Sequence, residues 1–570
     1  MIHLNKQLRI TVKLQDQRRI TLTPQDTRYA SYSIQEEEVA GGKRLRVFIE
    51  PVVALWIENA SIEWTQQIKA SDRLFFNGYQ SWTDAQELSM TDRMPSLRWF
   101  AKPLVKKYQF DKYGDTVIGK FSHRKGDFHG FSYCYLKGQD SVSLVASLNE
   151  HQGFTILTYQ NKKHVWTARK DLEGVVMTSK TCVFDLLFTT GNMSEVFDQY
   201  AHQLQIPRIE NRRYRGWTSW YNYYQNICEE IILKNLANYD HGQIDIFQID
   251  DGYQMAIGDW LDVDKKKFPK GMKYLADQIH AKGVKAGIWI APFVTEKKSS
   301  ITKNHPEWLI KDERGNYLEG GSNWSGFYVL NLELDEVKSY LRHVFSVVLD
   351  EWGYDMVKLD FLYALCILPT ASKSRGQIMA EGMDFLRECV GNRLILGCGV
   401  PLASSFGKVD FCRIGCDVGL DYNDKWFMKY FHRERISTYH AINNAIGRYE
   451  LNGRFFLNDP DVFLLRDDHL QLTDEQKTLL AKVNQWFGKI LFTSDDISLF
   501  SDEAMHLYQN VMDEQNIEID HVTTLKKGVY KVLGRCNGVK TCMYINSSDV
   551  LYHNSEVTLP AYQLEMREQK

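Results

Sequence analysis

Residues 354–363 read Tyr-Asp-Met-Val-Lys-Leu-Asp-Phe-Leu-Tyr, which is typical of a short buried strand that ends in polar residues. Lys358 and Asp360 are two positions apart, so on an extended chain their side chains point to the same face. An ammonium beside a carboxylate favours the ionised acid, and an ionised carboxylate can act as a nucleophile. A structural ion pair at a strand end is the alternative. The residues at the ends of the neighbouring strands are needed to choose between a catalytic and a structural role.

Seven further apolar stretches lie between about residues 212 and 516, separated by amphipathic helical patterns such as residues 426–446. In chain order, the eight strand candidates are residues 215–220, 244–249, 285–290, 356–360, 393–397, 411–415, 454–457 and 490–493. Eight such units predict a (β/α)8 TIM barrel. A doubly wound open sheet is the alternative, but no glycine fingerprint of dinucleotide binding follows any of these strands.

The chain on either side of this pattern has the two-residue period of β-strands. Residues 1–205 contain short runs rich in Val, Ile, Tyr, Phe and Thr between turn signals, which predicts an N-terminal β-sandwich domain. A helical period over residues 193–204 precedes a linker at Pro207. Residues 206–515 then form the predicted barrel, and residues 516–570 predict a small C-terminal antiparallel β-domain. The predicted fold class is therefore multidomain, α/β plus β.

Composition and charge narrow the classes of function. A net charge of −3 without a basic block argues against nucleic acid and anionic membranes as partners. Aromatic residues make up 13% of the chain, which fits carbohydrate binding because Trp and Tyr stack on the apolar faces of sugars. The ten cysteines are scattered, so we expect reduced thiols rather than a disulfide framework.

The N-terminal residues alternate between polar and apolar types and lack the apolar core of a signal peptide. No apolar run reaches the roughly 18 residues that a membrane span requires. We therefore expect a cytoplasmic protein without a membrane partner.

Catalytic groups in a TIM barrel come from the C-terminal ends of several strands. The predicted strand ends carry carboxylates, two cations, a thiol and aromatic rings. Carboxylates accept hydrogen bonds from hydroxyls, Lys and Arg donate them, and an indole covers an apolar ring face, so this set predicts a neutral, hydroxyl-rich ligand. The residues are Trp220, Tyr221, Asp250, Asp251, Trp289, Lys358, Asp360, Cys398, Arg413, Asp417, Asp459, Asp461, Asp495 and Asp496.

A divalent metal is the main rival to a sugar, because several of these carboxylates could supply hard oxygen ligands. None of them lies in a recognisable ligand loop, and Lys358 and Arg413 would compete for the same oxygens. Cys412 and Cys416 do not have the spacing of a usual zinc site either. We expect no metal and no cofactor. The candidate metal ligands are Asp250, Asp251, Asp459 and Asp461.

Glycoside hydrolysis needs two carboxyl groups, one ionised and one protonated. Asp360, beside Lys358, is placed to stay ionised. Asp417 lies four residues after Arg413 and beside glycines, where a turn would let it meet the leaving oxygen. A purely structural turn or N-cap role for Asp417 is the alternative.

Several stretches together resemble the glycoside hydrolase family 36 α-galactosidases, or melibiases, in their compact branch. Each motif alone is weak, but their order and their positions at successive strand ends make the resemblance specific, and it covers essentially the whole chain. The stretches are Phe76-Asn-Gly-Tyr-Gln-Ser-Trp82, Gly216-Trp-Thr-Ser-Trp-Tyr221, Phe247-Gln-Ile-Asp-Asp-Gly-Tyr253, Gly287-Ile-Trp289, Lys358-Leu-Asp360, Gly397-Cys-Gly399, Arg413-Ile-Gly-Cys-Asp417 and Asn458-Asp-Pro-Asp461.

The resemblance implies a retaining exo-α-galactosidase that works by double displacement, with Asp360 as the nucleophile and Asp417 as the acid/base. It implies that Asp250 and Asp251 hold the 4- and 6-hydroxyls of galactose and that Lys358 binds near the 3- and 4-hydroxyls. It further implies that Arg413 and Cys398 lie beside the 2-hydroxyl and that the pocket wall is formed by Trp220, Tyr221 and Trp289. Trp82, from the N-terminal domain, matches an aromatic residue that reaches over the barrel mouth to the substrate.

The expected substrate is a galactose-containing oligosaccharide such as melibiose or raffinose. An α-N-acetylgalactosaminidase and an α-galactosyl transglycosylase of the same fold stay open, although Cys398 with Arg413 argues for a plain 2-hydroxyl. A non-catalytic carbohydrate-binding protein would be expected to lack one of the two carboxylates, and both are present. The chain departs from the family at Cys416, where a small residue or proline is common, and it is short. Whether it forms a homo-oligomer is therefore open.

Overall fold

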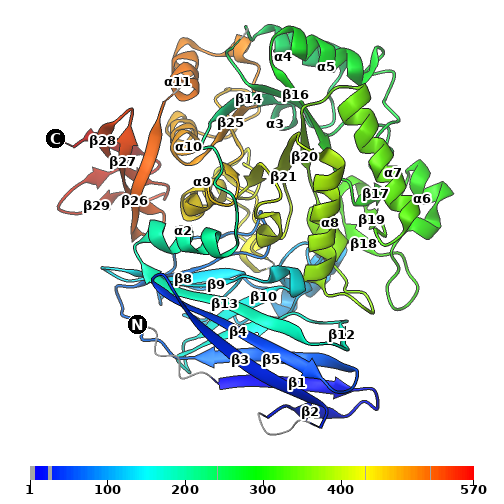
Figure 1. The fold of residues 1–570 in the computed structure, drawn as a ribbon. Helices are drawn as coiled ribbons and strands as arrows, with labels where there is room; N and C mark the ends of the chain where they lie inside the picture. The colour runs from blue at the N-terminus through cyan, green and yellow to red at the C-terminus, as the bar shows by residue number, and fades with distance from the viewer. Residues whose placement is uncertain (1–6, 24–27, 241, 431, 514, 570) are drawn as a thin grey trace.

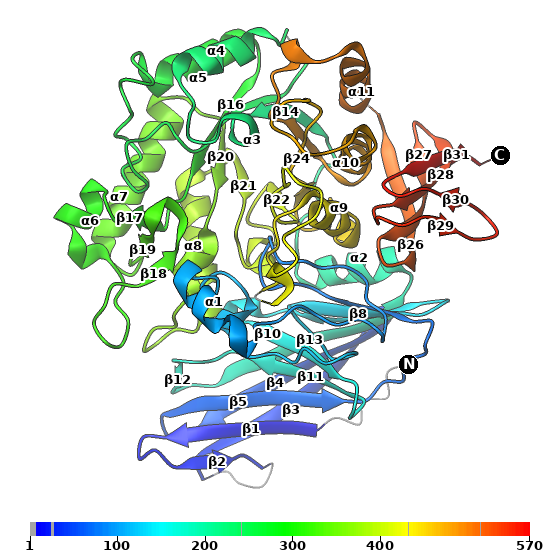
Figure 2. The ribbon, with the colours of Figure 1, turned by 180° about the vertical axis from the view of Figure 1, so that it is seen from behind.

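The computed structural model describes residues 7–23, 28–240, 242–430, 432–513 and 515–569. A curled parallel sheet lies between antiparallel sheets that come from the two ends of the chain (Figures 1 and 2). Within the described residues, no helix combines the length and apolar character that a membrane crossing requires.

The N-terminal part forms two antiparallel sheets around one apolar core. Ile10, Val12 and Leu14 of one sheet and Leu45 and Val47 of the other belong to this core, as the alternating pattern of the strands predicts. The first sheet contains β1 (Gln7–Leu14), β2 (Arg19–Thr21), β5 (Leu55–Trp64), β7 (Phe128–Phe131), β10 (Thr155–Gln160), β11 (Val165–Lys170) and β12 (Val176–Met177). The second contains β3 (Ala30–Val39), β4 (Gly42–Pro51), β6 (Arg73–Phe76), β8 (Tyr133–Lys137), β9 (Val142–Ser147) and β13 (Thr181–Gly191).

The long loop between β6 and β7 carries α1 (Lys102–Tyr108) and reaches the parallel sheet (Figure 2). The Ser81 amide donates to the Val400 carbonyl at 2.9 Å. The buried guanidinium of Arg448 donates to the carbonyls of Ser81 and Ile414 at 2.9 and 2.8 Å. These bonds fix the loop, and with it Trp82, against the parallel strands.

A helix predicted over residues 193–204 is present as α2 (Met193–Gln203). Asn192 and Glu195 form a reciprocal capping box at its start. Its apolar face buries Val196, Phe197 and Tyr200, and it packs between the second N-terminal sheet and the parallel sheet (Figure 1).

The parallel sheet has the strand order β23-β22-β21-β20-β16-β15-β14-β25-β24. Its two end strands, β23 and β24, are joined by Pro460 and Asp461 alone, so the sheet curls round until its ends meet. The strands are β14 (Tyr214–Thr218), β15 (Ile246–Ile249), β16 (Lys285–Ile290), β20 (Met356–Leu359), β21 (Leu394–Gly397), β22 (Phe411–Arg413), β23 (Leu457–Asp459), β24 (Val462–Phe463) and β25 (Ile490–Thr493). A strand occurs at or next to each of the eight predicted positions; the seventh begins at Leu457 instead of residue 454 and continues as β24.

The longer helices cover the outside of the parallel sheet (Figure 1). They are α4 (Glu229–Ala237), α5 (Gly271–Ala281), α7 (Asp335–Ser346), α8 (Arg375–Val390), α9 (Thr438–Gly447), α10 (Asp474–Phe487) and α11 (Asp502–Met512). The short α3 (Trp220–Tyr223) directly follows β14 at its carboxyl end, and the short α6 (Ser300–Asn304) lies in the chain between β16 and β20. The chain between β16 and β20 adds a small antiparallel sheet of β17 (Val294–Glu296), β18 (Glu319–Gly321) and β19 (Phe327–Val329).

The C-terminal part forms an antiparallel sheet of β26 (Ile517–Lys526), β27 (Val529–Cys536), β28 (Val539–Asn546) and β31 (Leu564–Glu568), with β29 (Tyr552–His553) paired to β30 (Thr558–Leu559). It lies beside α9 and α10 (Figure 1). The Tyr530 hydroxyl donates to Asn443 Oδ1 of α9 at 2.5 Å, which fastens the sheet to the parallel core.

Candidate active site

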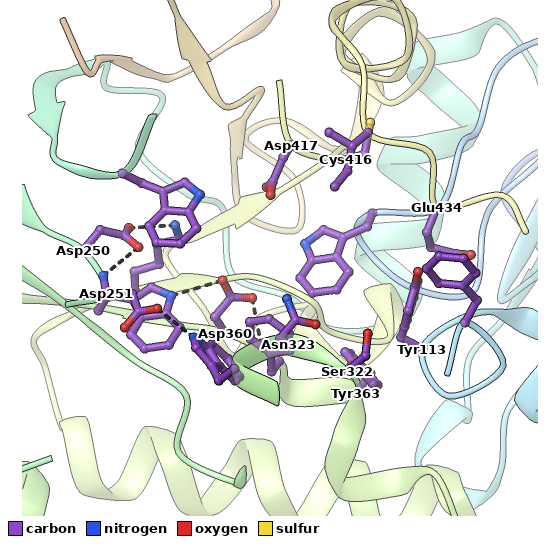
Figure 3. A pocket seen from close by; sticks show the side chains of 18 residues that line it. Tyr113, Asp250, Asp251, Ser322, Asn323, Asp360, Tyr363, Cys416, Asp417 and Glu434 are labelled. Atoms are coloured by element: carbon purple, nitrogen blue, oxygen red, sulfur yellow. Dashed lines mark hydrogen bonds and ion pairs between the residues drawn. The ribbon is translucent and has the colours of Figure 1, made fainter. Parts of the chain in front are cut away.

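A cavity of about 340 Å³ lies at the carboxyl ends of the parallel strands (Figure 3). Its size is typical of a site for a small molecule. Eight of the eleven site residues predicted from the sequence line it, and they come from five of the parallel strands or the turns after them and from the N-terminal loop. The eight are Trp82, Trp220, Asp250, Asp251, Trp289, Lys358, Asp360 and Asp417.

The other three predicted residues, Tyr221, Cys398 and Arg413, are not among the lining residues of the cavity. Each is almost fully buried behind it and contacts a residue of the site. They position groups of the cavity wall, as described below.

Asp360 follows β20 and is 7% exposed. The indole of Trp289 donates to Oδ2 at 3.2 Å, and the backbone amide of Phe361 donates to Oδ1 at 2.8 Å. Phe361 has a left-handed backbone with φ 55°, which is strained for a bulky residue and is found mostly at functional sites. Burial raises the pKa of Asp360; the positive charge of Lys358 opposes this shift, and the nearby Asp417 adds to it.

Lys358 makes its direct ion pair with Asp250, at 2.9 Å, rather than with Asp360. Both partners are buried, and Gln248 also donates to Asp250, at 2.7 Å. The strands β15 and β20 flank β16, so both side chains can meet across the cavity floor. Lys358 therefore does not form an ion pair with Asp360, as its position in the sequence suggested, but its positive charge still lowers the pKa of Asp360.

Asp251 is held by three side-chain donors. Gln254 donates to Oδ1 at 2.6 Å, and Gln225 and Trp324 donate to Oδ2 at 2.8 and 2.9 Å. Burial raises the pKa of this carboxyl, and the three donors oppose the shift. The arrangement fixes Asp251 as a rigid acceptor at one end of the cavity.

Asp417 is the more open of the two predicted catalytic carboxylates, with 38% of its side chain exposed. The buried guanidinium of Arg413 contacts Asp417 at 2.9 Å, Asp459 at 3.0 Å and Asp461 at 2.9 Å. Burial raises the pKa of Asp461 to about 7, against the opposing charge of Arg413. The Tyr221 hydroxyl also donates to Asp461. Arg413 therefore orients Asp417 through their ion pair. Tyr221 supports this arrangement by binding Asp461, which is a second partner of Arg413.

Asp360 and Asp417 both point into the cavity, between Asp250 and Asp251 on one side and Tyr113 and Glu434 on the other (Figure 3). One carboxylate is buried against an indole and the other is partly exposed and ion-paired. Two carboxyl groups in such different environments can divide the labour of acid and nucleophile.

The chain resembles known proteins in sequence and in structure. A family model described as Melibiase matches residues 183–443. The chain is therefore similar to the melibiase family over these residues. This confirms the resemblance predicted from the motifs.

Two curated α-galactosidases align with parts of this chain. One from Escherichia coli is 26% identical over 236 residues, which are 39% of this chain and 32% of that enzyme. One from Lactobacillus acidophilus is 31% identical over 183 residues, 30% of this chain and 24% of that protein. These alignments thus span about a third or less of the length of the two relatives.

Among solved structures, the α-galactosidase TtGalA from Thermus thermophilus, in complex with p-nitrophenyl α-D-galactopyranoside, has a TM-score of 0.67 and 26% identity. That alignment covers 90% of this chain and 96% of the other. The likeness therefore extends over the parallel sheet and the antiparallel sheets together.

Trp82 reaches the cavity from the N-terminal part of the chain. Its indole donates to the Cys398 thiol at 3.2 Å and packs edge-on against Phe361 at 5.4 Å between ring centroids. Gly399 has φ 56°, and a Cβ there would lie 2.9 Å from the Trp82 ring. Cys398 therefore binds this indole through its thiol, and Gly399 leaves the space that the indole ring occupies.

Sequence reasoning missed the loop between β18 and β19, whose residues Ser322, Asn323 and Trp324 line the cavity. The stretch Gly320-Gly-Ser-Asn-Trp-Ser-Gly326 carried a usable signal, because its glycines frame polar and aromatic residues in a short loop. The other lining residues it missed are Phe110, Tyr113, Phe361, Tyr363, Cys416, Glu434 and Ile436.

Glu434 is the carboxylate of the cavity lining that sequence reasoning missed. Its side chain is 2% exposed, and its Oε1 accepts from the Thr83 hydroxyl at 2.5 Å. Oε2 has no hydrogen-bond partner among the described residues, with His432 Nδ1 at 3.5 Å. An acceptor without a donor is therefore left at the far end of the cavity from Asp251.

No group of three or more His, Cys, Asp or Glu side chains is arranged to hold a metal ion in the part of the chain that the structure describes. Of the four carboxylates considered as metal ligands, Asp459 and Asp461 bind Arg413 and Asp250 binds Lys358.

Proposed function

We propose that the protein is an α-galactosidase that removes terminal α-linked galactose from oligosaccharides. The observation that carries this proposal is the pair Asp360 and Asp417 in one sugar-sized cavity, in a chain whose residues 183–443 match the melibiase family model. The relatives named above are α-galactosidases, and TtGalA was solved with an aryl α-galactoside.

The proposed mechanism is double displacement with retention of configuration. The Asp360 carboxylate attacks C1 of galactose and forms a covalent ester, while Asp417 gives its proton to the leaving oxygen as the glycosidic bond breaks. Asp417 then takes a proton from water, whose oxygen attacks C1 and releases Asp360. The charge of Lys358 opposes the rise in pKa that burial gives Asp360 and so favours the ionised nucleophile, and the partly exposed Asp417 is accessible to the incoming water.

The galactose ring is proposed to lie at the Asp250–Asp251 end of the cavity. Asp250 and Asp251 would accept from its 4- and 6-hydroxyls, and Lys358 would donate near the 3- and 4-hydroxyls. Trp289 and Trp220 would cover its apolar face. Arg413 and Cys398 lie behind the lining residues, so they would act near the 2-hydroxyl by orienting Asp417 and Trp82. Tyr113 and Glu434 would then face the leaving group.

The architecture supports the same proposal. We infer that the curled parallel sheet and its helices are a (β/α)8 TIM barrel over residues 206–515, since its two end strands meet. Residues 1–205 would form a β-sandwich domain and residues 516–570 a small antiparallel β-domain. The cytoplasmic location and the oligomeric state stay predictions.

The experiment is a comparison of kcat/KM for an aryl α-galactoside, an aryl α-N-acetylgalactosaminide and raffinose. We expect cleavage of the first and third and little of the second. Proton NMR of the first product formed should show α-galactose, whereas β-galactose would contradict retention. Preferred cleavage of the N-acetylated substrate would overturn the choice of sugar. Accumulation of galactosylated products instead of free galactose would identify a transglycosylase.

A further inference from the structure

A second cavity, of about 470 Å³, lies where the N-terminal loop, the segment before α9 and the β26–β27 hairpin come together. We call it the cationic cavity, because six cations line it and Asp84 is the carboxylate among its lining residues. The cations are Arg93, Arg98, Lys429, Arg433, Arg435 and Lys527.

The carboxylates of Asp84 and Asp424, near the cationic cavity, already have basic partners. Asp424 is 2.6 Å from Arg435, and the His440 ring lies between Asp84 at 3.2 Å and Asp424 at 3.6 Å. Burial alone would raise the pKa of Asp84, but the positive charges of His440, Arg435 and Arg433 hold it below its usual value.

The remaining cations lack acidic partners. In the described ranges, Arg93, Arg98 and Lys527 make no ion pair. The buried Arg433 donates to the carbonyls of His129, Phe76 and Asp84, at 3.2, 3.2 and 2.6 Å, so no carboxylate neutralises it in these bonds. A cavity whose cations exceed its carboxylates has a positive potential that attracts anions.

A buried donor without a partner also lies in the wall of the cationic cavity. Ser96 lines the cavity and is 9% exposed, and its hydroxyl has no hydrogen-bond partner among the residues that the structure describes. Buried hydroxyls are normally hydrogen-bonded. The Ser96 hydroxyl is therefore a second and independent sign of a ligand that accepts hydrogen bonds.

The two cavities share one stretch of chain. Arg433 and Arg435 line the cationic cavity, whereas Glu434 and Ile436 line the active-site cavity. Such alternation is the property of an extended segment, whose successive side chains point to opposite sides. A ligand held by Arg433 and Arg435 would thus lie on the other face of the segment that carries Glu434.

We propose that the cationic cavity binds a small phosphate-bearing anion, at a site separate from that of the sugar substrate. Guanidinium groups match phosphate oxygens with paired hydrogen bonds, and the Ser96 hydroxyl supplies a neutral donor. The volume is in the range of small-molecule sites and exceeds what a bare phosphate needs. This inference is independent of the proposed glycosidase activity.

The test measures binding of inorganic phosphate and of a hexose phosphate by calorimetry and thermal shift, with ionic strength held constant by chloride. The variant R93Q/R98Q removes two cations that make no ion pair. The control variant K265Q/K266Q removes two exposed cations that do not line either cavity. We expect saturable binding to the wild type and the control, and at least a tenfold rise in Kd for R93Q/R98Q.

Tighter binding of the hexose phosphate would identify a phosphorylated metabolite as the ligand class, and equal binding would identify the phosphate group alone. The variant Ser96→Ala, which changes one hydroxyl, should weaken binding as well and serves if R93Q/R98Q does not fold. No binding above the chloride baseline would overturn the proposal. If phosphate binding weakened equally in R93Q/R98Q and in the control variant, the proposal would also be overturned, because the loss of net charge alone would explain the result.

Discussion

The ammonium of Lys358 lies 2.9 Å from the carboxylate of Asp250, and both are buried. Asp360, two residues further along the chain, receives its hydrogen bonds from Trp289 and from the Phe361 amide instead. Lys358 therefore binds one carboxylate directly and acts on the other through its charge. Burial raises the pKa of Asp360 and Lys358 lowers it, so their balance sets the pH at which a nucleophile is available.

Replacing Lys358 by Met should move the acidic limb of the kcat/KM profile to higher pH. The nucleophile is active when ionised, so activity is lost as the pH falls through the pKa of Asp360. Without the Lys358 charge, burial raises that pKa further. KM should also rise, because Asp250 is left buried without its cation.

The control for this change is Lys297→Met, which removes a cation from an exposed ion pair with Glu319 outside the active-site cavity. Its pH profile should match that of the wild type. An acidic limb that stays in place in Lys358→Met, or moves to lower pH, would contradict the electrostatic link between Lys358 and Asp360.

Asp360→Ala should reduce turnover of an aryl α-galactoside by a factor on the order of 10⁴ or more, because the covalent step is lost. Added azide should restore turnover, since the small anion can enter the space of the missing carboxylate. The product would be the galactosyl azide with inverted configuration, identified by NMR. Asp277→Ala, on the exposed face of α5, is the control and should keep full activity. Wild-type turnover of Asp360→Ala would refute its role as the nucleophile.

Asp417→Ala should separate substrates by their leaving groups. An aryl group that leaves as a stable anion needs little protonation, whereas the sugar of raffinose needs a proton. We therefore expect a loss of roughly 10²- to 10⁴-fold on raffinose and a much smaller loss in the first step with the activated substrate. Pre-steady-state kinetics should separate this step from the slow hydrolysis of the intermediate. Equal losses in bond cleavage for both substrates would argue that Asp417 only shapes the site.

The strands and most of the site were predictable because both depend on local patterns. Short apolar runs that alternate with amphipathic helices gave strands at or beside all eight predicted positions. Residues such as Asp250 and Asp360 directly follow those strands, so the geometry of parallel strands brings them together at one edge.

Residues in irregular segments were not predictable in this way. The helical pattern over residues 426–446 becomes α-helix only from Thr438, after a 3-10 turn at Met428–Tyr430. The Ser437 hydroxyl caps α9 by accepting from the His440 amide at 3.1 Å. The preceding residues instead face two cavities, as Arg433 and Glu434 show. Which side chain lines which cavity depends on contacts with Thr83 and the N-terminal loop, more than 300 positions away in the chain. No local period encodes such contacts.

The pairing of Lys358 was missed for a related reason. Asp360 was the expected partner of Lys358 because the two residues are only two positions apart in the sequence. The carboxylate that pairs with the Lys358 ammonium is instead that of Asp250, which follows a different strand. Spacing along one strand shows which side chains share a face. It does not show which of several carboxylates at the centre of a sheet lies closest to a cation.

Glu434→Gln should affect long substrates and spare short ones. Its Oε2 is an acceptor without a hydrogen-bond partner at the end of the cavity where the leaving sugar is proposed to lie. A hydrogen bond from a sugar hydroxyl to a charged group contributes about 1.5 to 3 kcal/mol, so kcat/KM for raffinose should fall about tenfold or more. An aryl galactoside has no hydroxyl there and should be cleaved almost as by the wild type. Glu319→Gln, which alters a carboxylate outside the cavity, is the matched control. If Glu434→Gln lowered kcat/KM equally for both substrates, Glu434 would act on the fold of the segment and not on the leaving sugar.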